Sequence, residues 1–397
     1  MALTDFREYF DPTYQEILQK TLVGKKIANT RFQSDLKSGD TVNRMALDLS
    51  AVIVRDITAL TDRTIDPITD TQDTLTINFK KGVSFPLYNL EKIQAGSLNP
   101  GEEAGRNTAL KLATALDAFI LAETVNAWAV FDTGNLTTTD ANGTPITLSS
   151  TTVPQMVTMT EAKLRSNNVE MTNLCWVIDP FAFAQIAQFP IGKELNNSGT
   201  TFKNGYTGNV LGSEVYVSNN LTGEATLLSA GVFVDTQTIT INGVVLTTMT
   251  TLGATAGNVL IGANAAATIT NLAALLNAPG TTTAQGVALS AANQAKIAAL
   301  YLTATATSAT VLTIVAKGSS KLTLAETQTN VSWSTNFVHA YYGMKGGIDV
   351  VVQEEVDMVM LQEPKQRTVN ILADIVAGIK TFADGSQKFL DVKIANA

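Results

Sequence analysis

Charged residues are distributed very unevenly along the 397 residues of the chain. Residues 231–335 contain only five of them, whereas the other 292 residues contain 57. Threonine and alanine fill the charge-poor stretch, whose charged residues are Asp235, Lys296, Lys317, Lys321 and Glu326. Because an abrupt change of composition is typical of a boundary between packed units, we predict an inserted domain at residues 231–335.

The pattern inside this insert indicates a small α+β module. Alternating apolar residues predict strands at Thr238–Thr247 and Val311–Val315. Alanine-rich segments with helical spacing predict helices at Ala265–Asn277 and Ala291–Leu300. A low-complexity linker would not combine the two periods, so we expect a folded unit.

The whole chain is also poor in charge, with 16% charged and 45% hydrophobic residues. Typical soluble domains have about 25% charged residues, so partner copies could cover much of the surface. A net charge of −8 argues against a dedicated nucleic-acid binder, which usually has a basic face. One basic segment is either a solvated arm or a surface facing packaged nucleic acid, and it contains Lys20, Lys25, Lys26, Arg31 and Lys37.

The residues that carry most enzyme and metal chemistry are scarce. There is one cysteine, Cys175, in an apolar run, and one histidine, His339, between Phe337 and Tyr341. We predict that both are buried strand residues. This composition excludes an intramolecular disulfide and a cysteine/histidine zinc cluster, and it offers no nucleophile–histidine–acid motif. We therefore expect no enzymatic activity, no cofactor and no bound metal.

The remaining motifs have structural explanations that involve no chemistry. The carboxylate pairs Glu102-Glu103 and Glu354-Glu355 are adjacent, so their side chains point apart. The glycines of residues 343–347 lack phosphate-loop spacing, and the aspartates within Asp62–Asp73 miss calcium-loop spacing. The N-terminus lacks a signal-peptide pattern, and no uninterrupted apolar run reaches about 18 residues. We expect a soluble protein without a membrane span.

The region after the N-terminal arm is rich in β-structure. Alternation over Thr74–Phe79 and Val83–Leu87 predicts two strands, joined as a hairpin by a turn at Lys80-Lys81-Gly82. The aspartate-rich segment Asp62–Asp73 is predicted to be a solvated loop tip that projects from this β-structure.

The clearest single element is a long helix. Apolar residues follow helical spacing from Ala109 to Phe119 and Ile120, and the early acids Glu102 and Glu103 suit a helix N-terminus. Some 24 residues would span about 36 Å.

Shorter elements follow on either side of the insert. We predict a helix over residues 153–167, a buried strand at Cys175–Ile178 and a short helix that starts at Asp179-Pro180. The C-terminal strands are expected at Ile348–Gln353, Val356–Leu361, Val369–Gly378 and Lys388–Ile394. The predicted divisions are an arm (1–38), a β-rich region (39–100), the long helix (101–130), a mixed region (131–230), the insert (231–335) and a strand-rich return (336–397).

This order of elements resembles the major capsid proteins of tailed bacteriophages, which have the Hong Kong 97-type fold. Short runs outside the insert are similar to that family as well. They are Gly39–Val42, Glu103–Trp128, Trp176–Pro180, Leu211–Leu221, Tyr342–Gln353 and Gly378–Phe382.

The resemblance implies an α+β subunit of an icosahedral shell. It implies an N-terminal arm, an extended β-loop that overlaps the neighbouring subunit, a peripheral domain with the long spine helix, and an axial domain. The insert would decorate the outer face. Implied partners are other copies in hexamers and pentamers, portal and scaffolding proteins, a decoration protein, and double-stranded DNA through non-specific contact. The subunit would assemble in the host bacterial cytoplasm and remain in the virion.

Charged residues in and near the extended loop are candidate contacts between subunits, because opposite charges could set the register between copies. In crosslinking members of the family a lysine pairs with an asparagine, but no matching motif accompanies the lysines here. The candidates are Arg55, Asp62, Arg63, Asp66, Asp70, Lys80 and Lys81.

Two other functions remain open. A tail-tube or other virion structural protein would share the modules and the lack of chemistry. A carbohydrate-binding adhesin built around the threonine-rich insert is the other alternative, although the insert has few aromatic residues for sugar stacking, namely Phe233, Tyr301 and Trp333.

Overall fold

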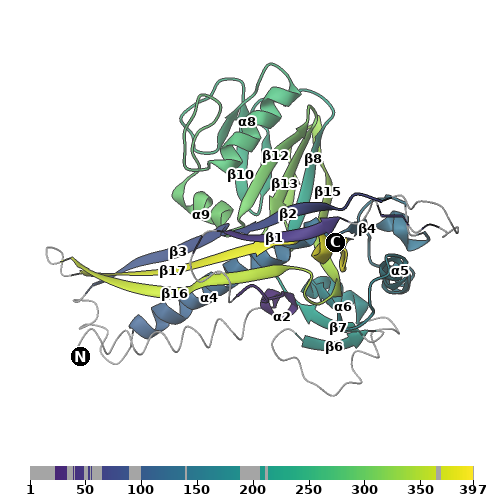
Figure 1. Cartoon of the computed structure of the whole chain (residues 1–397). Coiled ribbons are helices and arrows are strands. Elements are labelled where there is room, and N and C mark those ends of the chain that lie inside the picture. The colour runs from purple at the N-terminus through teal and green to yellow at the C-terminus, as the bar shows by residue number, and fades with distance from the viewer. Residues whose placement is uncertain are drawn as a thin grey trace.

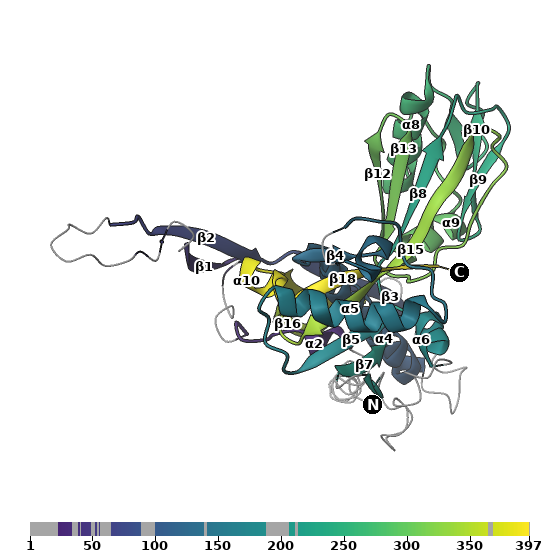
Figure 2. The same cartoon turned by 90° about the vertical axis from the view of Figure 1, so that its right-hand side faces the viewer.

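The computed structural model describes residues 23–33, 39, 41–48, 52–53, 55, 65–88, 100–138, 141–187, 206–210, 213–363 and 368–396. The architecture is α+β, as predicted. A host body carries a two-stranded ribbon that projects from one side (Figure 2). A second lobe stands on the body (Figures 1 and 2).

The ribbon consists of β1 (Thr41–Asp48) and β2 (Thr69–Thr76), which pair antiparallel along their whole length. Figure 2 shows it extending away from the body. The segment predicted to be a loop tip lies partly between these strands, at residues 65–68, and partly within β2 itself.

The predicted hairpin with a turn at Lys80-Lys81-Gly82 is wrong. These residues lie inside β3 (Phe79–Tyr88), which pairs with β17 (Thr368–Lys380) and not with β2. The side chain of Asn78 allows the change of partner: it donates to the carbonyl of Ile379 (2.8 Å) and accepts from the N–H of the same residue (3.0 Å). An amide can replace a strand's backbone in this way because it has both a donor and an acceptor.

A three-stranded antiparallel sheet in the order β16-β17-β3 lies along the long helix (Figure 1). β16 (Asp349–Glu363) is one strand, whereas two strands separated by Glu354-Glu355 were predicted. The pairing with β17 shifts register on both sides of Glu354. The acidic pair therefore marks a bulge inside a continuous strand, not a turn.

The predicted long helix is α4 (Pro100–Ala122), but its predicted end at residue 130 is wrong. A 3-10 turn, η1 (Glu123–Asn126), follows Ala122, and residues 129–131 form a strand. Leu112, Leu116 and Ile120 repeat at four-residue spacing, and all three are buried in the main core. The short helix α2 (Gly24–Ile27) packs against α4.

The host part of a nine-stranded sheet forms the centre of the body. Its strands are β4 (Ala129–Phe131), β5 (Leu174–Ile178), β6 (Tyr206–Val210), β7 (Ser213–Val217), β15 (Val331–Met344) and β18 (Phe389–Ala395). The helices around it are η2 (Thr133–Leu136), α5 (Thr152–Ser166), α6 (Pro180–Ile186) and α10 (Ala383–Ser386).

Sequence signals in this part of the host are confirmed. The carboxylate of Asp179 caps α6 by accepting hydrogen bonds from the N–H groups of Phe181 (3.2 Å) and Ala182 (2.9 Å). Cys175 is buried in β5, and burial raises the pKa of its thiol to about 12. A thiol in this environment is an inert core side chain.

The second lobe contains the predicted insert. Its first layer is β8 (Gly223–Ser229), β13 (Val311–Ala316), β12 (Leu302–Ser308) and the beginning of β15. Its second layer is the four-stranded sheet of β9 (Thr238–Ile241), β10 (Val244–Met249), β11 (Asn258–Leu260) and β14 (Leu324–Glu326), with helices α8 (Ala265–Asn277) and α9 (Ala291–Ala299).

Both predicted helices of the insert are confirmed, but Thr238–Thr247 is two strands instead of one. A tight turn at Asn242-Gly243, where φ is 46° and 73°, joins β9 to β10. Asparagine and glycine favour this turn because both central residues need positive φ.

The lobe and the body share a strand. β15 pairs with β8 at its beginning and with β5 and β18 at its end. The core of the lobe also includes Ala225 and Leu227 from β8, which precede the charge-poor stretch. The lobe therefore continues the host sheet and is not connected by a flexible linker.

Candidate assembly surface

An ion pair joins the two sides of the ribbon's tip. The guanidinium of Arg55 donates two hydrogen bonds of 2.7 Å to the carboxylate of Asp66, which also accepts from the N–H of Ile53 (2.9 Å). The Arg55 guanidinium and the Ile53 N–H lower the pKa of Asp66 to about 2. These two predicted contact residues thus pair with each other inside one chain.

Two further ion pairs connect the base of the ribbon to the body. Arg44 on β1 binds Asp384 of α10, with an Nη2–Oδ2 distance of 2.9 Å, and its hydrogen bond lowers the pKa of that carboxyl group. Lys380 at the end of β17 pairs with Asp73 of β2 and donates to the carbonyl of Thr74 (2.7 Å). These charged contacts, together with an apolar cluster of Leu75, Val351 and Phe382, hold the base of the ribbon against the body.

Large apolar side chains along the ribbon are exposed. Ile65 is 91% exposed, Met45 72% and Ile53 60%, and Val52 and Ile68 are also exposed. Neighbouring exposed aliphatic side chains on a projecting element are unusual for a protein that works alone, and they typically mark an interaction site.

The other predicted contact residues have different positions. Asp62 and Arg63 lie outside the described residues, and Asp70 is exposed on β2. Lys80 is exposed on β3, whereas the Lys81 amine lies 5.4 Å from the ring centroids of both Phe119 and Tyr301. Lys81 thus contacts its own chain.

The predicted genome-facing residues are also engaged within the chain where they are described. Lys20 lies outside the described residues, and Lys25 and Lys26 belong to α2. The Lys26 amine lies 5.7 Å from the ring centroid of Tyr216, and partial burial lowers its pKa. Arg31 forms an ion pair with Asp349, with two nitrogen–oxygen distances of 3.1 Å.

Asp117, a residue without a predicted role, joins three segments of the body. Its buried carboxylate accepts from the N–H of Gly24 (2.6 Å), the amide of Asn220 (2.8 Å) and the hydroxyl of Ser218 (3.3 Å). Burial raises the pKa of this carboxyl group despite these hydrogen bonds. Its sequence signal was a lone acid in the apolar pattern of the long helix.

His339 is buried in β15, as predicted, but it lies between two carboxylates. Its Nδ1 is 2.8 Å from Asp391 of β18, and its Nε2 is 3.2 Å from Glu224 of β8. Burial lowers the pKa of His339, but Asp391 and then Glu224 outweigh burial and raise the pKa to about 9. The protonated ring donates to both neighbours where the lobe joins the body.

Raising the pH from about 6.5 to about 9 should therefore destabilise the protein by on the order of 3 kcal/mol. The folded pKa of about 9 lies above the ordinary value of 6.5, so this stabilisation is complete below 6.5 and lost as the pH rises through 9. Chemical unfolding across this pH window measures the slope of the free energy of unfolding against pH. The His339→Gln variant should lose most of the slope, and an unchanged slope would contradict the assignment.

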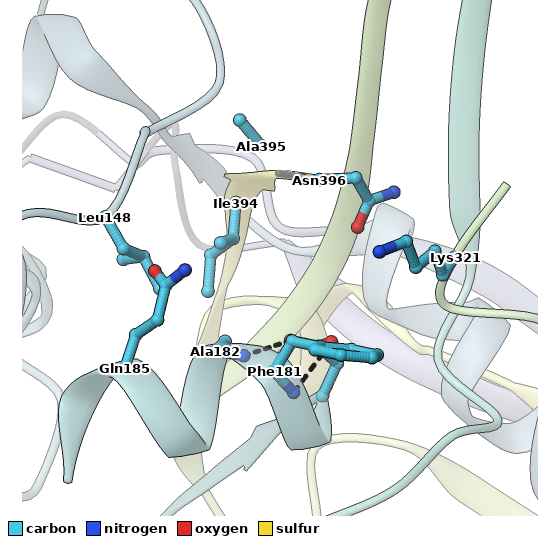
Figure 3. A pocket seen from close by; sticks show the side chains of 9 residues that line it. Leu148, Phe181, Ala182, Gln185, Lys321, Ile394, Ala395 and Asn396 are labelled. Atoms are coloured by element: carbon cyan, nitrogen blue, oxygen red, sulfur yellow. Dashed lines mark hydrogen bonds between the residues drawn. The ribbon is translucent and has the colours of Figure 1, made fainter. Parts of the chain in front are cut away.

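A cavity of about 60 Å³ lies between α6, the end of β18 and Lys321. Figure 3 shows the side chains that line it. This volume has room for a few water molecules only. Among the described residues, no group of three or more histidine, cysteine or acidic side chains could hold a metal ion. No helix in the described part of the chain is long and apolar enough to cross a membrane.

Comparisons with known proteins give structural similarities only. No protein-family model matches the chain, and no curated protein matches it. A structure from Mycobacterium phage Che8 is 13% identical with a TM-score of 0.49, covering 93% of this chain and 90% of that one. The capsid structure of cyanophage P-SCSP1u is 11% identical with a TM-score of 0.49, covering 95% and 89%.

A virus-like particle from Pyrococcus furiosus is 9% identical with a TM-score of 0.44, covering 98% of each chain. The similarity to these three structures lies in the course of the backbone.

Proposed function

We propose that this chain is the major capsid protein of a tailed bacteriophage, which assembles with copies of itself into an icosahedral shell around the genome. The observation that carries the proposal is the ribbon. It projects from the body and has exposed apolar side chains that the subunit itself does not cover. In this proposal its function is structural and not catalytic.

The ribbon would act by lying over a neighbouring subunit. Eight paired residues span about 26 Å, enough to reach beyond the subunit's own body. Burying its apolar side chains contributes about 25 cal/mol per Å² of apolar surface removed from water. Contacts that are weak one at a time become strong when a closed symmetric shell repeats them.

The remaining assignments belong to the same proposal. Residues 1–38 act as an arm, of which residues 23–33 pack on the body. The ribbon acts as the extended loop, and residues 231–335 decorate the outer face. Portal and scaffolding proteins, a decoration protein and packaged double-stranded DNA are proposed partners. Assembly would occur in the cytoplasm of the host bacterium.

Electron microscopy of the purified full-length chain tests the proposal against its main alternative. Closed shells, or hexamers and pentamers, are expected. Tubes would instead indicate a tail-tube protein. Glycan binding by a chain that forms neither would indicate an adhesin.

The ion pairs at the ribbon's base provide a second test. The double substitution Arg44→Ala/Lys380→Ala should lower shell yield about tenfold, because roughly 1 kcal/mol lost per ribbon recurs at every copy. Sedimentation of assembly reactions measures the yield. Arg165→Ala is the matched control, because it removes an exposed ion pair with Glu161 on α5, away from the ribbon. Equal yields from both variants would show that the ribbon's angle is unimportant.

A further inference from the structure

The end of the inserted lobe that is nearest to the body packs against the long helix α4. The Tyr301 ring meets the Phe119 ring of α4 edge-on, with centroids 5.4 Å apart, and Tyr301 packs against the host core. The Lys317 amine lies 4.8 Å from the Phe119 centroid. These contacts form one end of the surface by which the lobe packs on the body, which we call the foot.

The next residues of the lobe reach a different part of the body. The Lys321 amine lies 4.5 Å from the ring centroid of Phe181 on α6. Ser320 accepts from the side chain of Asn396 (3.2 Å) and donates its N–H to the carbonyl of Asn219 (3.2 Å). Figure 3 shows Lys321, Phe181 and Asn396 around the small cavity.

This lobe has few charged residues. Two of the five charged residues between 231 and 335, Lys317 and Lys321, lie over aromatic rings of the host. Cations are attracted to the faces of aromatic rings, so each contact favours one fixed position of the lobe.

We infer that the insert is an internal brace: its foot, formed by Tyr301, Lys317, Ser320 and Lys321, joins α4 to α6 and the C-terminal segment. In this arrangement the lobe is a structural part of the host and holds the long helix against the rest of the body. The inference does not depend on the capsid assignment, because every contact lies within one chain.

Two double-mutant cycles on the full chain test the brace, with the thermal midpoint as the readout. One cycle combines Tyr301→Ala with Phe119→Ala, and the other combines Lys321→Ala with Phe181→Ala. In each, the double variant should shift the midpoint by about 2 °C less than the sum of the single variants, because contacting residues are coupled. Additive shifts in either cycle would overturn the brace, since one attached end cannot join two elements.

A control cycle and a second measurement separate the brace from general destabilisation. Lys296→Ala removes an exposed lysine of α9, and its combination with Phe181→Ala should be additive. Hydrogen exchange at residues 112–121 should accelerate about tenfold in Tyr301→Ala/Lys317→Ala/Lys321→Ala relative to Lys296→Ala. Exchange at the Lys296→Ala rate would show that the lobe merely rests on α4, and it would also overturn the inference.

Discussion

Replacing Ile53, Ile65 and Ile68 by aspartate is expected to abolish shell assembly and to leave the subunit folded. All three side chains are exposed in the isolated subunit, so the substitutions remove no core contact. In a subunit interface, however, each aspartate would bury a charge without a partner, which costs far more than the lost apolar contact. Size-exclusion chromatography and electron microscopy should show soluble subunits and no shells.

The control for this experiment introduces aspartate on the inserted lobe instead of on the ribbon. Val232 and Val245 are also exposed there, at 52% and 46%, and aspartate at both positions should leave assembly unchanged. Normal shells from the ribbon variant would remove the observation on which the proposed function depends. Loss of shells from both variants would point to a general effect of added negative charge.

Asp117→Ala is expected to lower the free energy of unfolding by about 3 kcal/mol. The substitution leaves the N–H of Gly24 and the amide of Asn220 without their acceptor in a buried environment. It also releases α2 from α4. Urea unfolding should be measured in the ribbon-aspartate background, because assembly would otherwise stabilise the folded state by mass action.

Thr114→Ala is the matched control on the same helix. The Thr114 hydroxyl donates only to the carbonyl of Leu110 one turn earlier, so its loss should cost about 0.5 kcal/mol or less. Equal unfolding midpoints for the two variants would mean that Asp117 does not hold α2 in place.

The elements that the sequence predicted well are those specified by near neighbours. Leu112, Leu116 and Ile120 define the buried face of α4 through four-residue spacing alone. Asp179 caps α6 through atoms two and three residues away. The low charge content of residues 231–335 likewise indicated most of a second core.

The errors concern partners that are distant in the chain. Alternation of apolar residues indicates a strand but does not identify the strand that it pairs with. Residues 74–88 therefore suggested a hairpin, whereas β2 pairs with β1 and β3 pairs with β17, which lies almost 300 residues further along. The acidic pair at Glu354-Glu355 suggested a break between two strands, because the bulge that it marks depends on the opposite strand.

Charged residues show the same difference between features set by the local sequence and features set by distant partners. Composition determined that this chain is sparsely charged, with one histidine, one cysteine and a charge-poor insert, and residue periodicity indicated an α+β host. Only the tertiary structure decided that Arg55 meets Asp66, that His339 lies between Glu224 and Asp391, and that the foot lysines cover host aromatic rings. The physical reason is that periodicity and capping act over a few residues, whereas ion pairs and sheet register depend on which distant segments the fold brings together.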